Sequence, residues 1–261
     1  MKSSKEQYKR TYKALILDVD GTIILNKKDS MPSQKTTKAI GEASKHLYVC
    51  LATSRPYKDA FEIINHLSLS GYSVINGGSQ IIDGKSKKIV WEQPMLQKDV
   101  KVLLDMFQHT LNIPFWLNDG VNDLGSPLRF LPKRIYQIYI GTDLSNDAAD
   151  ALIDTISHIP TIAAHKVPSW YKGYFCIIIT HALATKQHGI FEVAKLLDIN
   201  THDIIGVGDG YNDFPLLMAC GLKVAMGNAV PELKEIADYI APSVEEDGIA
   251  DVVKKFIFDI S

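Results

Sequence analysis

The chain has 261 residues, of which 46% are hydrophobic, 9% aromatic and 22% charged. At roughly 150 residues per domain, this length corresponds to one large domain or two modest ones. A disordered chain combines low hydrophobicity with high net charge, and since this chain has neither, its body is expected to fold. Lys and Arg total 28 against 30 Asp and Glu. This near balance argues against nucleic acid as a partner, because such binding relies on a basic stripe.

The N-terminal residues, the longest apolar stretch and the cysteines all point to a cytoplasmic protein. Residues 1–11 read as a disordered basic tail and lack the apolar segment of a secretory signal. The longest apolar stretch, 174–179, is far shorter than the ~20 residues that cross a bilayer. Cys50, Cys176 and Cys220 stand singly in apolar segments, so we expect buried reduced thiols with no disulfide and no zinc. The sequence therefore predicts a cytoplasmic protein with no membrane partner.

From residue 12 onward, apolar runs alternate with segments of helical spacing. Strands are predicted at 12–17, 47–52 and 72–75, with helices at 33–47 and 57–67. Near the C-terminus the alternation resumes, with helices at 186–197, 214–219, 231–237 and 249–257, and strands at 203–207, 222–226 and 239–241. This order is typical of a mostly parallel sheet covered on both faces. Residues 12–83 and 182–261 are thus predicted to form one doubly wound, Rossmann-like α/β core.

Residues 84–181 have a different pattern. Strands are predicted at 88–91, 113–117, 135–140, 161–164 and 174–179. Helical spacing occurs only at 97–110 and 146–156. Several strands with two helices predict an α+β module inserted into the core, its sheet covered on one side by the helix pair.

Two carboxylates follow the first predicted strand, in the segment Asp18-Val-Asp20-Gly-Thr. Residues at i and i+2 leave a strand on the same side, and the carboxyl edge of a doubly wound sheet is where ligands bind. Close carboxylates persist when a cation lies between them or when one is protonated. The segment therefore indicates a Mg²⁺ site or a general acid, with an ordinary Asx-rich turn as the alternative.

A second acidic segment follows the predicted strand 203–207 and contains Asp209, Asn212 and Asp213. Its carboxylates are hard oxygen ligands of the kind that Mg²⁺ prefers. Taken alone, a Gly-Asp-Gly segment is more often just a turn. Because both acidic segments end strands of one predicted sheet, we expect Asp18 and Asp209 to meet around a single cation.

Two further segments could bind a phosphate. Thr53 and Ser54 follow the predicted strand 47–52 and precede a helix, where backbone N–H groups favour anions. An ordinary helix cap is the alternative for these residues. Lys186 stands at the start of another predicted helix, and the alternative for a lone lysine is that it faces solvent.

Together, Asp18-Val-Asp-Gly-Thr, Ala52-Thr-Ser-Arg-Pro, Lys186, and Gly208-Asp-Gly-Tyr-Asn-Asp followed by Val224-Ala-Met-Gly-Asn-Ala resemble an ordered set of known motifs. They resemble the four motifs of the haloacid dehalogenase-like superfamily, and more narrowly its Cof-type sugar-phosphatase branch. The resemblance covers about 12–83 and 182–261. The insertion at 84–181 has the place and size of that branch's large α+β cap.

The resemblance implies a role for each acidic residue. Asp18 would be the nucleophile that forms an aspartyl-phosphate, and Asp20 the general acid that then activates water. Mg²⁺ would be held by Asp18, the backbone carbonyl of Asp20 and Asp209. Asp213 would order the metal's shell through water.

The resemblance also implies which residues bind the phosphoryl oxygens, namely Thr53, Ser54, Lys186 and Asn212. Arg55 is a candidate substrate contact. The chain departs from the branch in having Ser54 after the threonine and Gln187 after the lysine, where glycine is usual. These departures concern affinity for phosphate more than the chemistry.

The implied function is a Mg²⁺-dependent phosphatase that acts on small phosphorylated metabolites, with sugar phosphates as the expected class. It would act as a monomer or weak homo-oligomer. A phosphomutase of the same superfamily is one alternative, although the phosphomannomutase group shares the Asp-x-Asp-Gly-Thr opening but not the Ala-Thr-Ser-Arg-Pro element. A non-catalytic phosphate or metabolite sensor is the other, although a sensor has no need of Asp20 as an acid.

Overall fold

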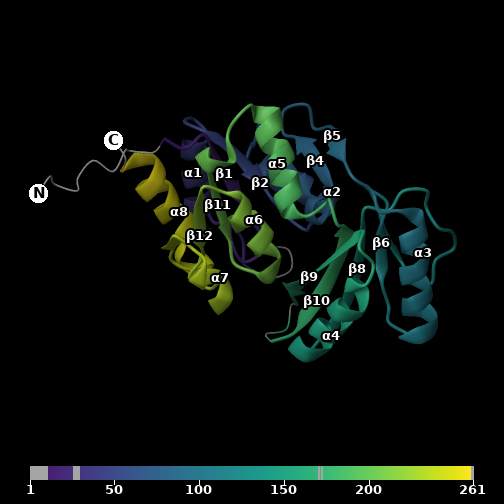
Figure 1. Ribbon diagram of the computed structural model, residues 1–261. Coiled ribbons are helices and arrows are strands. Elements are labelled where there is room, and N and C mark those ends of the chain that lie inside the picture. The colour runs from purple at the N-terminus through teal and green to yellow at the C-terminus, as the bar shows by residue number, and fades with distance from the viewer. Residues whose placement is uncertain (1–10, 26–29, 170, 172, 260–261) are drawn as a thin grey trace, which may run out of the picture.

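The computed structural model describes residues 11–25, 30–169, 171 and 173–259 (Figure 1). The predicted tail, apart from Thr11, lies outside the described residues. A parallel sheet of five strands, in the order β13-β12-β11-β1-β2, forms the centre of the core. Its strands are β1 (Ala14–Leu17), β2 (Tyr48–Leu51), β11 (Ile204–Gly208), β12 (Leu222–Ala225) and β13 (Tyr239–Ile240).

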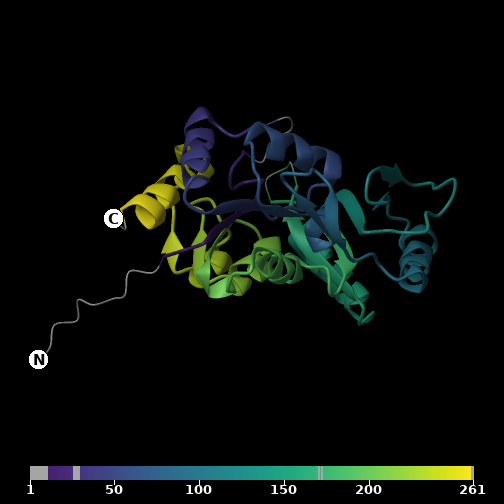
Figure 2. The same cartoon turned by 90° about the horizontal axis from the view of Figure 1, so that it is seen from above.

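Helices cover both faces of this sheet, as Figure 2 shows. Successive side chains of β1 point to opposite faces, so Leu15 and Leu17 join one buried cluster while Ala14 and Ile16 join another. The first cluster includes residues of α1 (Gln34–Ala43), α2 (Tyr57–His66) and α8 (Gly248–Val253). The second includes residues of α5 (Lys186–Leu197), α6 (Phe214–Ala219) and α7 (Pro231–Glu235). The prediction of a doubly wound α/β core is confirmed.

A second sheet of three antiparallel strands contains β3 (Tyr72–Ile75), β4 (Gln80–Asp83) and β5 (Ile89–Glu92). The strand at 72–75 was expected in the parallel sheet, but among the described residues a single isolated bridge, between Ala52 and Val74, connects it there. Residues 76–78 have φ of 51°, 70° and 122°, and this left-handed turn folds the chain back at once into β4. The strand expected at 88–91 as part of the inserted module therefore pairs with β4 instead.

The inserted module contains an antiparallel sheet in the order β7-β6-β8-β10-β9. Its strands are β6 (Trp116–Asn118), β7 (Asp123–Gly125), β8 (Gln137–Leu144), β9 (Ile162–Pro168) and β10 (Phe175–His181). One face, with Leu117, Ile138 and Ile177, packs on α3 (Gln97–Asp105) and α4 (Asn146–Ser157) in a single buried cluster. The helix pair thus covers one side of the sheet, as expected. The assignment of the module to 84–181 stays a prediction.

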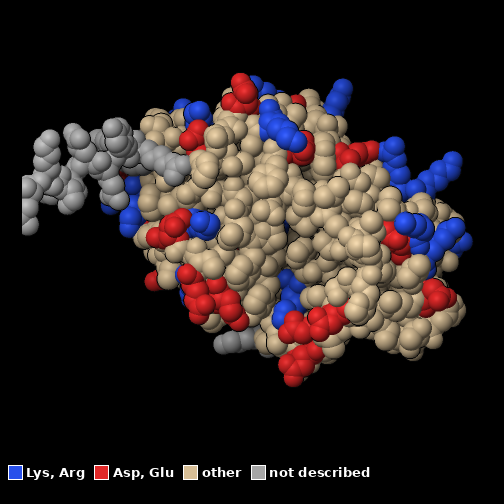
Figure 3. Space-filling model, viewed as in Figure 1, with Lys and Arg blue, Asp and Glu red and all other residues tan. Residues whose placement is uncertain are grey.

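The three cysteines are buried and free. Burial raises the pKa of the Cys50 thiol to about 12, which keeps it protonated. In the parts of the chain that the structure describes, no helix is long and apolar enough to span a membrane. On the face drawn in Figure 3, basic and acidic side chains are interspersed.

Candidate active site

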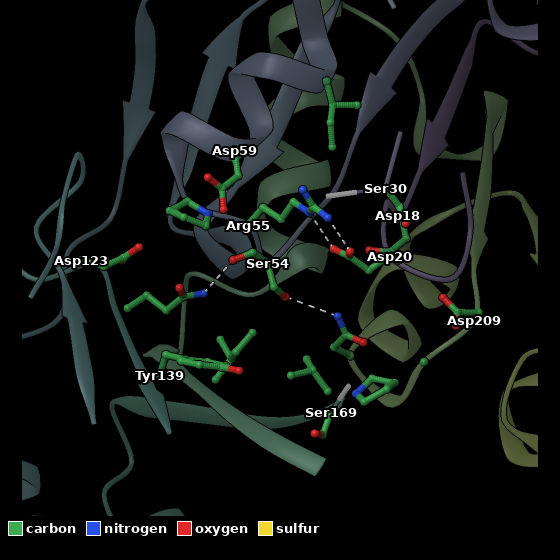
Figure 4. Close-up of a pocket in the computed structure, with 18 of the residues that line it drawn as sticks. Asp18, Asp20, Ser30, Ser54, Arg55, Asp59, Asp123, Tyr139, Ser169 and Asp209 are labelled. Atoms are coloured by element: carbon green, nitrogen blue, oxygen red, sulfur yellow. Dashed lines mark hydrogen bonds and ion pairs between the residues drawn. The ribbon is translucent and has the colours of Figure 1, made fainter. Parts of the chain in front are cut away.

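A cavity of about 770 Å³ opens between the core and the module, at the carboxyl ends of the parallel strands. Figure 4 shows its side chains, with Asp18 and Asp209 at one end and Asp123 and Tyr139 at the other. The loops that follow β1, β2 and β11 supply one wall. The uncovered face of the module's sheet supplies another, with Trp116, Gln137, Tyr139 and Ile178.

Lys186 is a buried cation that contacts Asp18, one of the residues that line this cavity. It is the first residue of α5, whose N-cap Thr185 accepts a hydrogen bond from the backbone N–H of His188. The Nζ lies 2.5 Å from Asp18 Oδ1 and 2.6 Å from Asp213 Oδ1, and the side chain is 2% exposed. Lys186 therefore does not face solvent but bridges two acidic side chains from opposite ends of the sequence.

The two acidic segments converge as expected. Carboxylate oxygens of Asp18, Asp209 and Asp213 all lie within 4.8 Å of one another, and all three residues are buried. Burial, and then the negative charge of Asp213, raises the pKa of Asp18 to about 7. Burial, and then the negative charges of Asp18 and Asp213, raises the pKa of Asp209 well above its usual value. Three buried carboxylates against one lysine leave excess negative charge, which fits a divalent cation.

The neighbouring carboxylates stabilise the positive charge of Lys186. Burial alone lowers the pKa of an amine, but the charges of Asp18 and Asp213 outweigh it and raise the pKa of Lys186 above its usual value. Lys186 contacts Oδ1 of each aspartate. The lysine therefore contacts Oδ1 of Asp18 and not Oδ2.

Two residues that were not predicted orient Asp209. Thr22 Oγ1 donates to Asp209 Oδ1 at 3.1 Å, and Asn228 Nδ2 lies 3.4 Å from Asp209 Oδ2. Asn228 also donates to the backbone carbonyl of Gly21 at 2.8 Å and so links the loops after β1 and β12. Asn228 follows β12, at an edge of the parallel sheet, and this position is the sequence signal that could have identified it.

Asp213 braces the loop that carries Asp209. Its Oδ2 accepts the backbone N–H groups of Asp209 at 3.0 Å and Gly210 at 2.9 Å. Gly208 lies so close to it that a Cβ on that glycine would come 2.5 Å from the Asp213 Cβ. The acidic segment is therefore held by its own side chain as well as by Lys186.

Of the expected phosphate-binding residues, Ser54 and Asn212 line the cavity. Thr53 is buried, and its Oγ1 accepts the backbone N–H of Arg55 at 3.1 Å. Asn212 Nδ2 donates to Ser54 Oγ at 3.3 Å, which connects the loops after β2 and β11. From the module, Gln137 Nε2 donates to the backbone carbonyl of Ser54 at 3.1 Å.

Asp20 points away from the three-carboxylate group, and its side chain pairs with Arg55 (Figure 4). Arg55 lines the cavity, as a substrate contact would, but its guanidinium is engaged by Asp20. Beyond it lie Asp59 and Asp123, which had not been singled out.

The chain is similar to several known proteins. The sequence matches the haloacid dehalogenase-like hydrolase family over residues 15–123 and 129–253. It is 25% identical to "Putative phosphatase YkrA" of Bacillus subtilis, covering 93% of this chain and 97% of that protein. It is 27% identical to "5-amino-6-(5-phospho-D-ribitylamino)uracil phosphatase YcsE" of the same organism, covering 94% and 96%. A solved structure described as a subclass IIB sugar phosphatase has a TM-score of 0.76 at 22% identity, covering 95% and 100%.

The family match runs through the core and most of the inserted module, and the structural likeness extends over nearly the whole chain. The expected resemblance is therefore confirmed. The chain belongs to the haloacid dehalogenase-like hydrolases.

Proposed function

We propose that this protein is a Mg²⁺-dependent phosphatase that hydrolyses small phosphorylated metabolites through an aspartyl-phosphate, with sugar phosphates as the preferred class. The observation that carries the proposal is the buried Lys186 between Asp18 and Asp213, where Asp18 also lines the large cavity. The names of relatives support a phosphate monoester as substrate, and one structural neighbour is called a sugar phosphatase.

The metal would be held by Asp18, Asp209 and the backbone carbonyl of Asp20, with Asp213 acting through water. The closeness of the buried carboxylates supports this assignment. A bound divalent ion would supply positive charge that offsets carboxylate repulsion and the charge of the phosphoryl group.

In the first step, a carboxylate oxygen of Asp18 attacks phosphorus and the bond from phosphorus to the ester oxygen breaks. Asp20 gives its proton to that oxygen, which leaves as an alcohol. In the second step, Asp20 takes a proton from a water molecule that attacks the same phosphorus. The bond to Asp18 breaks, and inorganic phosphate, a free Asp18 carboxylate and a protonated Asp20 result.

The remaining residues align the phosphoryl group. Thr53, Ser54, Lys186 and Asn212 would bind its oxygens, and this matters because phosphoryl transfer depends mainly on alignment and charge neutralisation. The module's wall over the cavity would exclude water and contact the leaving group.

The test is release of inorganic phosphate from p-nitrophenyl phosphate and glucose 6-phosphate, with Mg²⁺ and with EDTA. Wild-type protein should release phosphate only with Mg²⁺. Asp20→Asn should abolish turnover while Mg²⁺ still binds, as measured by calorimetry, whereas Asp154→Asn on the exposed side of α4 should match wild type. Isomerisation of the sugar phosphate without release would indicate a phosphomutase, and phosphate binding without turnover a sensor.

A further inference from the structure

Ser54, in the loop after β2, is held by hydrogen bonds from three separate parts of the chain. Its backbone carbonyl accepts the Nε2 amide of Gln137, in β8 of the module, at 3.1 Å. Its Oγ accepts the Nδ2 amide of Asn212 at 3.3 Å (Figure 4). The carbonyl of the preceding Thr53 accepts the backbone N–H of Gly77 at 3.1 Å. The loop is therefore fixed by groups that do not belong to it.

Two of these bonds fix the peptide groups on either side of the Ser54 Cα. A trans peptide group is planar, and its C=O and N–H point in opposite directions. Gly77 holds the peptide group that carries the Ser54 N–H, and Gln137 holds the following one. Because both planes are held, the direction of the Ser54 N–H is set by the turn at 76–78 together with the module.

The Ser54 N–H is the donor of this loop that is left for a ligand. The N–H of Thr53 donates to the carbonyl of Val74 at 2.9 Å, and the N–H of Arg55 donates to Thr53 Oγ1 at 3.1 Å. Within the described ranges, no protein group accepts the Ser54 N–H. Since Ser54 lines the cavity, this N–H is a preorganised donor for a phosphoryl oxygen.

The Gln137 amide is built into its contact with Ser54. Gln137 is 5% exposed and lies on the uncovered face of the module's sheet, because the next residue, Ile138, joins the buried cluster on the other face. A buried amide costs free energy unless it is hydrogen-bonded, and the Ser54 carbonyl is its partner. A Cβ on Gly77 would come 3.2 Å from Gln137 Nε2, so the glycine leaves room for the amide.

We propose that Gln137 is a positioning residue, through which the inserted module sets the direction of the Ser54 N–H and hence the affinity of the site for a phosphoryl group. The inference rests on the proposed phosphatase activity. Because Gln137 acts through the Ser54 carbonyl and not on the leaving group, its effect is the same for every phosphate ester. The effect extends to inorganic phosphate, which has no leaving group.

Two substitutions test this role. Gln137→Met keeps the length of the side chain but removes the donor, and Gln137→Asn keeps the amide but is shorter by one methylene group. Since one hydrogen bond is lost, we expect either variant to bind inorganic phosphate roughly three- to tenfold more weakly in the presence of Mg²⁺, as measured by calorimetry. Mg²⁺ affinity without phosphate should stay unchanged.

The kinetics should show the same factor. In both variants, kcat/KM for p-nitrophenyl phosphate and for glucose 6-phosphate should fall equally, through a higher KM, because the interaction is made in the ground state as well as in the transition state. A loss for glucose 6-phosphate alone, with phosphate affinity unchanged, would indicate that Gln137 contacts the leaving group and would overturn the inference.

Gln97→Met is the matched control. Gln97 Nε2 also donates to backbone carbonyls, those of Pro132 at 3.2 Å and Lys133 at 2.9 Å, and Gln97 does not line the cavity. This variant should keep the phosphate affinity of wild type, and circular dichroism should show that every variant is folded.

Unchanged phosphate affinity in Gln137→Met, or an equal loss in Gln97→Met, would overturn the inference while the phosphatase proposal stands. If wild-type protein releases phosphate from neither substrate, the phosphatase proposal itself fails, whereas calorimetry of phosphate binding still tests the role of Gln137.

Discussion

Gly21 lies directly against the carboxylate of Asp209, so that a Cβ on this glycine would come 2.2 Å from Asp209 Oδ2. Gly21 also has a φ of 83°, which side-chain-bearing residues rarely adopt. The turn after β1 is therefore fitted to the acidic group after β11, and the loops cannot be changed independently.

We expect Gly21→Ala to destabilise the protein by about 1–3 kcal/mol because of the strained backbone and the contact with Asp209. Displacing Asp209 should also weaken Mg²⁺ binding, measured by calorimetry. Gly41→Ala is the matched control, since a Cβ there meets no atom within 4 Å in the exposed face of α1. It should raise stability by about 0.5–1 kcal/mol, and a similar effect of both substitutions would contradict the argument.

Removing the buried cation should be costly. Lys186→Met leaves Asp18 and Asp213 without their shared partner, and breaking a buried ion pair costs about 3–5 kcal/mol. Chemical denaturation in EDTA measures this loss. Lys195→Met, on the same helix, removes an exposed pair with Glu192 and should change stability by less than about 1 kcal/mol. Equal losses would show that Lys186 is not buried between carboxylates.

The metal-free protein should lose stability as the pH rises. The pKa of Asp18 is raised from 3.8 to about 7 in the folded state. Between these values the folded protein binds a proton that the unfolded chain releases, so this contribution falls from about pH 4 to pH 7. Mg²⁺ competes with that proton, and the rise in Tm on adding Mg²⁺ should grow from pH 5 to pH 8. A rise independent of pH would remove Asp18 from the metal site.

His165 in β9 should have the opposite effect to Asp18, since its contribution to stability should rise with pH. Its Nε2 is buried and has no hydrogen-bond partner in the described part of the chain. Burial, and then the charge of Lys186, lowers the pKa of His165 from 6.5 to about 4. At a pH below the pKa of His165 in the unfolded chain, the unfolded chain binds more protons than the folded protein. Stability therefore falls as the pH is lowered from about 6.5 to about 4. His165→Phe should remove this fall, whereas His158→Phe at an exposed position should not.

Much of the active site could be predicted because it follows from strand order. Asp18 and Asp209 follow strands of one parallel sheet, and the carboxyl ends of such strands meet at the same edge. The bond from Lys186 to both aspartates is less local. A lone lysine at a helix start carries no sign of burial, so its place in the sequence made Lys186 a candidate phosphate-binding residue but did not predict its contact with both aspartates.

Other features depend on tertiary contacts that the spacing of residues in the sequence does not predict. The sheet of β3, β4 and β5 depends on three successive left-handed residues at 76–78, which turn an apparent βαβ pattern into an antiparallel return. Arg55 was read as a substrate contact, yet its partner Asp20 is set by the approach of two separate loops. Asn228 likewise gains its role only when the loop after β12 meets Gly21.

The position of β1 between β2 and β11 has a consequence for biosynthesis. While the ribosome is still translating the inserted module, β1 can pair with β2, but its other edge has no neighbour until residues 204–208 emerge. The nascent chain then exposes an apolar strand edge, which is prone to aggregate. Chaperone engagement during synthesis should therefore end only after β11 has left the exit tunnel.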